Sequence, residues 1–504
     1  MHRLQYLVTS LVLPFFVSGQ AKVPIEDKEF WYNEGRTTLH ATLAKRLNLN
    51  VARNVILFVG DGMGISTVTA ARIFREQRLG HLGEEGFLSW ETFPDVGLVK
   101  TYNVDKQVPD SAATATALFT GVKTNFLTVG VDATSRYNVC DATVLQRATA
   151  SSMIAWAQQS GKDTGIITTT RITHATPAAM YAHTQNREWE CDSSIPPEYR
   201  GCVKDIARQL IEDEPGRNIK VILGGGLQQF SSLETPQNSS CRRQDGRNLT
   251  ELWRADKIKR GAKANFVQTT EQLMALRPND EDQFVLGLFN LGHMDYDAVR
   301  DRRPEGAPSI VNMTIKAIEL LQKNDKGYLL VIEGGRIDHA HHDNMARLSL
   351  LETVQMDAAV TAALERTSRE DTLIMVTADH SHTMTINGYP ARGNDILGLA
   401  QINEGMPIYE TLTYANGPGF DVHRKIGAIA SDEYLWKKLE TMDRKALNYR
   451  HFAPIKDSIE THDFISETAL SKFSTFRAIM VTWAPRRAAS NATHLPMPKE
   501  PPVT

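Results

Sequence analysis

The sequence lacks the features that mark several common classes of protein. Its formal net charge is only −3, with 56 Lys and Arg against 59 Asp and Glu, so no basic surface for a nucleic acid is indicated. No internal repeat or low-complexity block divides its 504 residues. Apolar content of 41% and charged content of 23% are ordinary for a globular protein. We therefore expect one large domain that carries insertions, because a chain of this length exceeds a single small core.

The sequence also has little that could span a membrane near its N-terminus. The apolar run at residues 7–17 is too short to cross a bilayer comfortably, and Pro14 interrupts it. It follows Arg3 and precedes two small residues, which is the pattern of a cleaved secretory signal. We predict a signal peptide over residues 1–19 and export through the secretory pathway, to the cell surface or the extracellular space.

Cysteine is scarce, with four residues in the chain. Export makes disulfide bonds possible, and the sequence leaves all three pairings of four cysteines open. These cysteines are Cys140, Cys191, Cys202 and Cys241. Four Asn-x-Ser/Thr triplets agree with an exported glycoprotein. They begin at Asn238, Asn248, Asn312 and Asn491.

One pattern recurs in the sequence: an apolar run that ends in an acidic residue. Such runs cover residues 55–59, 329–332 and 373–378, and each is typical of a buried strand. The acids at their ends are Asp61, Glu333 and Asp379. In open α/β sheets the functional crevice lies outside the carboxyl ends of the strands. We therefore predict an α/β fold in which these three carboxylates converge on a metal.

The segment after Glu333 has the most informative spacing. If a helix starts near residue 337, Asp338 and His342 lie on one face, where an oxygen and a nitrogen can share one cation. His380 directly follows Asp379 in the third run. A histidine at one loop–helix junction could equally cap backbone groups. The same arrangement at three strand ends favours a metal site.

Ser111 lies between a Pro-Asp turn and an Ala-rich helix expected over residues 112–117. A hydroxyl at a helix N-terminus meets free N–H groups and the positive end of the dipole, which suits an anion bonded to that oxygen. The alternative is a simple N-cap serine. No nearby histidine offers itself as a base in sequence, but a metal could lower the pKa of the hydroxyl.

A further strand expected over residues 163–170 leads to His174 and Thr176. The Thr176 hydroxyl suits a hard cation, and Arg187 could grip an oxyanion. Taken singly, each is equally typical of a capped strand end or a surface arginine. The glycines at 224–226 lack the spacing and the lysine of a phosphate-binding loop.

The regular alternation of strands and helices weakens toward the C-terminus. Residues 388–453 contain turns rich in Gly, Pro and Tyr, which indicates an inserted subdomain. One isolated histidine, His462, follows. We expect the catalytic domain to cover residues 20–462 and a poorly ordered, proline-containing tail to cover residues 463–504.

Four motifs together resemble those of the alkaline phosphatases, most nearly the animal tissue-type branch that includes membrane-bound insect enzymes. They are Val-Gly-Asp-Gly-Met-Gly at 59–64, Pro-Asp-Ser-Ala-Ala-Thr at 109–114, Glu-Gly-Gly-Arg-Ile-Asp-His at 333–339 and Thr-Ala-Asp-His-Ser-His at 377–382. The resemblance implies a large central, mostly parallel sheet sandwiched by helices, with an inserted crown-type subdomain. It also implies hydrolysis of phosphate monoesters and assembly as a homodimer.

The resemblance assigns two zinc ions and one magnesium ion to residues of this sequence. The first zinc would take Asp338, His342 and His462. The second zinc would take Asp61, Asp379 and His380. The magnesium would take Asp61, Thr176 and Glu333.

The same resemblance assigns the remaining roles. Ser111 would become phosphorylated, and Arg187 would hold the phosphate. His174 and His339 would lie beside the metals. Cys140 would pair with Cys202, whereas Cys191 and Cys241 are additional cysteines whose pairing stays open.

Two departures from the family pattern carry expectations of their own. The residues after His462 do not match the family, and residues 463–504 lack the apolar end that is exchanged for a lipid anchor, so a membrane anchor is not supported. A calcium site of the animal branch would use Phe289 and Glu305, but Asn290 replaces an acid, which leaves calcium open. The alternative function is a binding protein with this fold that has lost turnover. A sulfatase or phosphodiesterase on the same fold is disfavoured, because the setting of Ser111 differs.

Overall fold

The computed structural model describes residues 26–44, 48–231, 241–278, 283–400 and 409–416. The signal peptide expected at 1–19, the tail expected at 463–504 and His462 lie outside these residues. Most of the insertion expected at 388–453 also lies outside them.

The chain divides into two compact units, Met1–Leu49 and Asn50–Thr504. The described part of the first unit is essentially one helix, α1 (Lys28–Leu43). Asp27 caps it, because its Oδ1 accepts a hydrogen bond of 2.9 Å from the backbone N–H of Phe30. None of the residues of α1 is buried.

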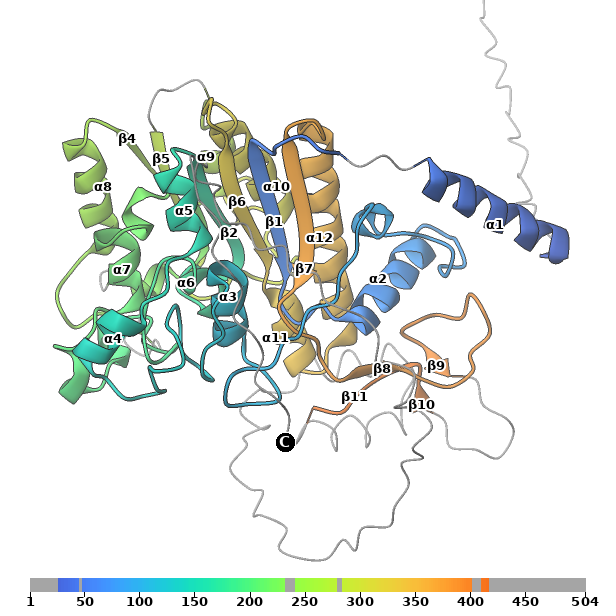
Figure 1. Cartoon of the computed structure of the whole chain (residues 1–504), viewed down its shortest axis with the longest axis horizontal. Helices are drawn as coiled ribbons and strands as arrows, with labels where there is room; N and C mark the ends of the chain where they lie inside the picture. The colour runs from blue at the N-terminus through green and yellow to red at the C-terminus, as the bar shows by residue number, and fades with distance from the viewer. Residues whose placement is uncertain (1–25, 45–47, 232–240, 279–282, 401–408, 417–504) are drawn as a thin grey trace, which may run out of the picture. The chain divides into compact units, whose positions relative to one another are not determined.

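Seven strands form the central sheet of the second unit, in the order β4-β5-β3-β2-β6-β1-β7, and every neighbouring pair is parallel (Figure 1). Their bounds are β1 Asn54–Gly60, β2 Asp163–Arg171, β3 Val221–Gly225, β4 Lys263–Val267, β5 Gln283–Leu288, β6 Tyr328–Gly334 and β7 Thr372–Ala378. The expectation of a large parallel sheet in an α/β fold is confirmed.

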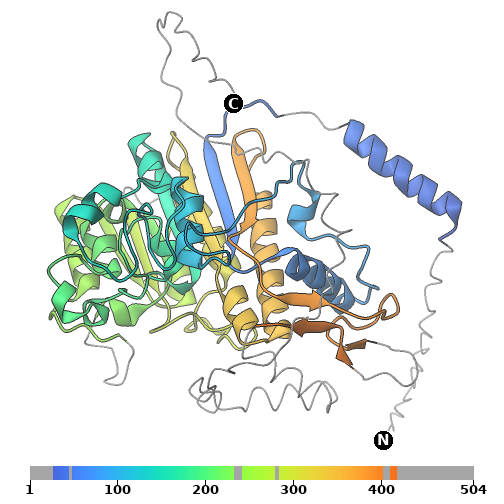
Figure 2. The same cartoon turned by 60° about the horizontal axis from the view of Figure 1, so that its bottom comes forward.

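Helices cover both faces of this sheet, as a parallel sheet requires (Figure 2). Their bounds are α2 Ile65–Arg78, α3 Ser111–Thr120, α4 Ala142–Ala148, α5 Met153–Gln159, α6 Ala175–Ala178, α7 Ile206–Glu212, α8 Leu249–Lys259, α9 Thr270–Met274, α10 Ile310–Leu321, α11 Arg336–His342 and α12 Ala346–Arg366. Among the described helices, none is long and apolar enough to cross a bilayer.

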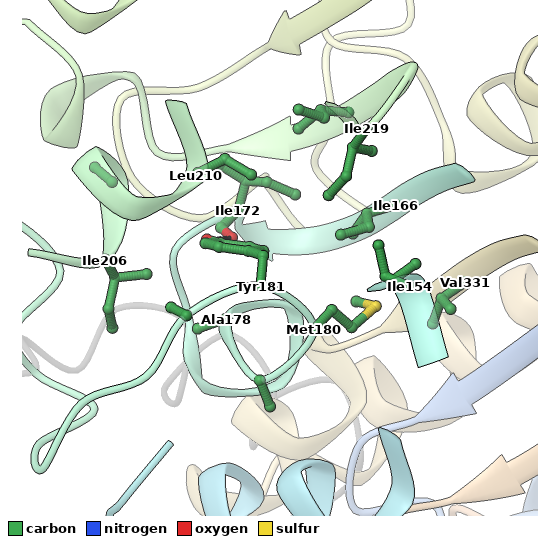
Figure 3. Close-up of a cluster of buried hydrophobic side chains, with 14 of the residues drawn as sticks. Ile154, Ile166, Ile172, Ala178, Met180, Tyr181, Ile206, Leu210, Ile219 and Val331 are labelled. Atoms are coloured by element: carbon green, nitrogen blue, oxygen red, sulfur yellow. Dashed lines mark hydrogen bonds between the residues drawn. The ribbon is translucent and has the colours of Figure 1, made fainter. Parts of the chain in front are cut away.

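The two faces of the sheet build two separate hydrophobic clusters, because successive side chains of a strand point to opposite faces. From β1, Leu57 and Val59 enter one cluster, together with apolar residues of α3, α5, α7 and α8. Ile56 and Phe58 enter the other, together with residues of α10 and α12. Figure 3 shows part of the first cluster around Ile166 of β2. Each buried side chain of this size contributes about 1.5–3 kcal/mol, so both faces hold the strand ends in place.

Two small antiparallel pairs follow β7. Strand β8 (Met384–Ile386) pairs with β11 (Leu412–Tyr414), and β9 (Leu399–Ala400) pairs with β10 (Tyr409–Glu410). These pairs include the described start of the expected insertion.

All four cysteines are joined in two disulfides. The pairing of Cys140 with Cys202, which the resemblance implied, is present. The structure also pairs Cys191 with Cys241, which the sequence had left open. Both bridges join segments that follow α3 in the chain.

Candidate metal centre

The carboxyl ends of three adjacent strands bring the expected acids together. In the sheet β1 lies between β6 and β7, and Val59 of β1 is level with Glu333 of β6 and Thr377 of β7. Asp61 and Asp379 follow directly beyond these positions. The functional edge of an open α/β sheet is its carboxyl edge, and here the strand register alone places three carboxylates on it.

The first group at this edge consists of Asp61, Asp379 and His380, whose ligand atoms lie within 4.8 Å of one another. Nε2 of His380 lies 3.5 Å from Oδ1 of Asp61 and 3.4 Å from Oδ2 of Asp379. The backbone N–H groups of Gly62 and His380 donate to Oδ1 of Asp379 at 3.0 and 2.7 Å and orient that carboxylate. Two carboxylates and one imidazole match the donor set of a zinc site.

Ser111 faces this group from the first residue of α3. Its hydroxyl oxygen lies 3.3 Å from Oδ1 of Asp61 and 3.2 Å from Nε2 of His380. The helix begins here because the side chain of Asp110 accepts a hydrogen bond from the backbone N–H of Ala112 at 3.1 Å. Asp110, not Ser111, is therefore the N-cap, and this excludes the simple capping explanation for the serine.

A second group consists of oxygen atoms that lack hydrogen-bond partners among the described residues. Oδ2 of Asp61, Oγ1 of Thr176 and Oε1 of Glu333 are all buried and unpartnered. Buried polar atoms are otherwise almost always paired, so three such oxygens from the expected magnesium ligands call for an explanation. An all-oxygen donor set is what Mg²⁺ prefers, and a bound cation would satisfy all three atoms.

The third group combines Asp338 of α11 with two histidines. His342, one helical turn later, places Nε2 3.5 Å from Oδ2 of Asp338. His382 donates a hydrogen bond to Oδ1 of Asp338 from the loop after β7. The sequence prediction named Asp338 and His342 but missed His382. Its presence in the motif at 377–382, two residues after His380, was the signal that could have identified it.

Gly62 allows the loop after β1 to lie close to His382 in the loop after β7 and to Asp338 of α11. Its φ of +67° lies in the left-handed region, which favours glycine. A Cβ at this position would also lie 2.5 Å from a ring carbon of His382 and 3.1 Å from Oδ1 of Asp338. A side chain at residue 62 would therefore push the Asp338 group away from the Asp61 group.

Four buried carboxylates give the centre a strongly negative character. Asp61, Glu333, Asp338 and Asp379 are each at most 5% exposed. Burial, followed by repulsion from the other three acids, raises the pKa of Asp61 well above its usual value, although Arg187 opposes the shift. Burial also raises the pKa of Glu333 to about 7. Bound cations would remove both effects, because they neutralise the charges that the apo protein must hold in a low dielectric.

In the third group the pKa of the carboxylate shifts in the opposite direction. Burial opposes ionisation of Asp338, but the hydrogen bond and charge of His382, with smaller effects of His342 and His380, lower its pKa overall. For His380, burial opposes protonation, yet Asp379 and Asp338 raise the pKa above its usual value. Protonated imidazoles thus partly neutralise the negative charge of the carboxylates, until a bound metal displaces the imidazole protons.

Arg187 is held beside this centre by two partners. Its Nη1 lies 3.3 Å from Oδ2 of Asp110, and its Nη2 donates to Nε2 of His174 at 3.0 Å. Asp110 therefore connects the expected phosphate-binding arginine to the start of α3. The sequence prediction did not assign any role to Asp110.

A cluster of three imidazoles lies behind Arg187. His174, His293 and His339 have ring centroids 4.4 to 5.3 Å apart. Burial is the largest cause that lowers the pKa of each ring, and guanidinium groups lower it further, so the pKa of His339 falls to about 3. The surrounding arginines are Arg171, Arg187 and Arg336. Because these cations repel a metal ion, His293 and His339 are better explained as neutral acceptors that orient the arginines. His174 accepts from Arg187, but it also has a ring nitrogen within 4.8 Å of carboxylate oxygens of Asp61 and Glu333. His293 was missed by the sequence prediction.

The parallel sheet and the groups of carboxylates and imidazoles at its edge define a metal-dependent hydrolase. Comparison with known proteins is consistent with this class. The sequence profile of the alkaline phosphatase family matches residues 52–461. The chain belongs to the alkaline phosphatase family.

Individual relatives cover most of the chain. Alkaline phosphatase 4 of Drosophila melanogaster is 44% identical in an alignment of 480 positions that covers 89% of this chain and 78% of the relative. The membrane-bound alkaline phosphatase of Bombyx mori is 43% identical over 373 residues, which are 73% of this chain and 67% of the relative. The alkaline phosphatase of Thermus thermophilus superposes with a TM-score of 0.53 at 28% identity and covers 71% of this chain and 66% of that chain. The chain is therefore a phosphomonoester hydrolase of this family.

Proposed function

We propose that this protein hydrolyses phosphate monoesters through a phosphorylated Ser111, with two zinc ions and one magnesium ion held by the groups described above. The observation that carries the proposal is the position of the Ser111 hydroxyl, within 3.3 Å of both Asp61 and His380 and at the N-terminus of α3. The other oxygen of Asp61 is one of the three buried oxygens without a geometric hydrogen-bond partner that belong to the expected magnesium ligands.

The ions are assigned by donor type. The first zinc takes Asp338 and His342, with His462 outside the described residues as its third ligand. The second zinc takes Asp61, Asp379 and His380, and the magnesium takes Asp61, Thr176 and Glu333. When bound, these cations lower the pKa of the serine hydroxyl and neutralise charge on the phosphoryl oxygens. The alkaline phosphatase of the Antarctic bacterium TAB5 shares the fold, and a variant of it has Mg bound in its M3 site.

The protein side chains perform the reaction steps in two displacements. The Ser111 oxygen forms a bond to phosphorus, the bond from phosphorus to the ester oxygen breaks, and the alcohol leaves with a proton. Water then attacks the phosphoserine, which releases inorganic phosphate and restores the hydroxyl. Arg187 donates hydrogen bonds to the non-bridging oxygens in both steps, while Asp110 and His174 hold its guanidinium group.

The proposal extends to assembly as a homodimer and to export. Seven apolar residues of the segment from 87 to 108 are at least half exposed, which is unusual for the surface of a monomer. They are Phe87, Val96, Leu98, Val99, Tyr102, Val104 and Val108. A second copy of the chain would cover them. Two disulfides support passage through an oxidising compartment.

The test combines metal content with turnover. Full-length protein purified without chelator should contain two equivalents of zinc and one of magnesium by elemental analysis, and it should hydrolyse 4-nitrophenyl phosphate at alkaline pH. Removal of metal should abolish turnover, and addition of both metals should restore it. A protein that holds the metals but never releases nitrophenol would instead support the binding-protein alternative.

A further inference from the structure

His341 is a buried residue of the metal-bearing helix α11 that the proposed mechanism does not use. It lies between the two expected zinc ligands of this helix in sequence and is 0% exposed. Its Nδ1 lies 2.8 Å from the hydroxyl of Tyr414 in strand β11. Its Nε2 lies 2.9 Å from the hydroxyl of Thr67 in α2 and 2.8 Å from the hydroxyl of Ser349 in α12. Helices α2 and α12 and strand β11 therefore all hold the imidazole of His341.

A second side chain near β11 binds the same residue. Nδ2 of Asn416 donates to the backbone carbonyl of His341 at 2.7 Å and to Oδ1 of Asn344 at 2.9 Å. Alternate residues of an extended segment point the same way, so Tyr414 and Asn416 both face α11. The last carbonyl groups of a helix lack partners within the helix. The His341 carbonyl already accepts a hydrogen bond of 3.0 Å from the backbone N–H of Asn344, so Asn416 adds a side-chain hydrogen bond at the end of α11 that carries His342.

The same segment also holds the loop after β7. The backbone N–H of Ala415 donates to the carbonyl of Thr383 at 3.2 Å, and the Thr383 hydroxyl donates to Oδ1 of Asn416 at 2.6 Å. Thr383 directly follows His382 in this loop. The amide of Asn416 thus links the C-terminal end of α11 to the loop that carries His380 and His382.

The two linked elements meet at the metal centre. The ring of His341 lies against the ring of His382, with centroids 5.0 Å apart and planes tilted by 30°. His382 in turn donates a hydrogen bond to Oδ1 of Asp338. A displacement of Tyr414 would therefore move the Asp338 carboxylate, because the packed rings of His341 and His382 connect the two.

We propose that Tyr414 and Asn416 are positioning residues for the zinc site on α11, and that they set its zinc affinity without contacting zinc or substrate. This inference rests on the proposed zinc centre. Their hydrogen bonds fix the angle at which α11 and the loop after β7 present Asp338, His342 and His382. Partners that orient metal ligands typically contribute about 10-fold to 100-fold to metal affinity, which is the size of effect expected here.

The test uses full-length protein carrying Tyr414→Phe, and separately Asn416→Ala. The matched control is Tyr409→Phe, which removes the same hydroxyl from the neighbouring strand β10. Zinc affinity is measured by competition with a coloured chelator, and the secondary structure and melting temperature of each metal-free protein are measured in parallel. Both variants should lose one zinc about 10-fold to 100-fold more readily than the control. Turnover should recover at saturating zinc with the KM for 4-nitrophenyl phosphate unchanged.

The outcomes separate this inference from the proposed function. If the wild-type protein binds two zinc ions and both variants bind them as tightly as the control does, the positioning role is wrong and the two residues only support the fold. A melting temperature that falls without any change in zinc affinity leads to the same conclusion. If the wild-type protein binds no zinc, both the proposed function and this inference fail.

Discussion

The hydroxyl oxygen of Ser111 lies 3.3 Å from Oδ1 of Asp61, although 50 residues separate the two in the chain. Ser111 starts helix α3, and Asp61 directly follows strand β1. The contact brings the positive end of a helix dipole against a carboxylate whose pKa is raised well above its usual value by burial and by neighbouring acids. An oxygen in this position can form a bond to phosphorus while cations neutralise the surrounding acids.

Replacement of the nucleophile gives the first prediction. Ser111→Ala should reduce turnover of 4-nitrophenyl phosphate by at least about 1,000-fold, because it removes the oxygen that accepts the phosphoryl group. Incubation of the wild-type protein with labelled phosphate at acid pH should trap a phosphoserine, which peptide mapping locates. The control is Ser368→Ala, since that hydroxyl only caps a turn at Glu370. Label on any residue other than Ser111 would show that the nucleophile is misassigned.

The shared ligand gives the second prediction. Asp61→Asn should deplete both zinc and magnesium, because the two oxygens of Asp61 face different groups of ligands. The metal-free variant should nevertheless be at least as stable as the metal-free wild-type protein at neutral pH, since burial and three neighbouring acids disfavour the Asp61 charge. Elemental analysis and chemical denaturation measure the two effects, with the exposed Asp95→Asn as control. Full retention of either metal would contradict the bridging role.

The unpartnered hydroxyl of Thr176 gives the third prediction. Thr176→Val should weaken magnesium binding while zinc content is kept. The neighbour of this hydroxyl is the Glu333 carboxylate, whose pKa it lowers without a hydrogen bond of good geometry, so its removal should change the stability of the metal-free protein by no more than about 1 kcal/mol. Thr173→Val is the contrasting control, since its hydroxyl donates to Oε2 of Glu190 at 2.5 Å and its loss should destabilise by about 1 kcal/mol or more. Unchanged magnesium affinity in Thr176→Val would remove Thr176 from the ligand set.

A buried acid outside the metal centre gives the fourth prediction, which concerns pH. Burial raises the pKa of Glu352 in α12 from its ordinary value of 4.5 to about 7, although its carboxylate accepts a hydrogen bond of 2.6 Å from the backbone N–H of Asp297. The folded protein thus binds this proton more tightly than the unfolded chain does. The resulting stability is fully present below pH 4.5 and is lost as the pH rises through 7.

Glu352→Gln should therefore raise the free energy of unfolding above pH 7 by roughly 2 kcal/mol, and it should have little effect near pH 5. Chemical denaturation at the two pH values, under identical metal concentrations, measures the difference. Glu365→Gln on the same helix is the control, because the Glu365 side chain is 67% exposed. An equal effect of Glu352→Gln at both pH values would mean that the carboxyl does not titrate in this range.

Local patterns in the sequence were enough to predict the strands and the helix that carry the expected metal ligands. The apolar runs before Asp61 and Glu333 predicted β1 and β6, because a buried parallel strand requires a continuous apolar run. The run before Asp379 predicted β7 as a strand, but β7 lies at the edge of the described sheet and its residues are partly buried or exposed, so the expectation of a buried strand there was wrong. The four-residue spacing of Asp338 and His342 predicted α11. In each case the information lies within ten neighbouring residues.

Neither β4 nor β5 was predicted. Strand β5 (Gln283–Leu288) is fully buried and mostly apolar, so its residues did carry the same signal as β1 and β6. Strand β4 (Lys263–Val267) lies at the edge of the sheet, and most of its residues are only partly buried, so it needs no continuous apolar run. The pairing of Cys191 with Cys241 was equally open, because four cysteines allow three pairings and only the folded chain brings two sulfur atoms together.

Only the tertiary structure identified His382, His293 and Asp110 as neighbours of the expected site residues. His382 forms a hydrogen bond with Asp338, which lies 44 positions away in the chain. Tyr414 forms one with His341, which lies 73 positions away. A hydrogen bond between such distant residues depends on how strands, loops and helices pack. No periodicity in the sequence reports that packing, because the side chains that meet belong to separate local patterns.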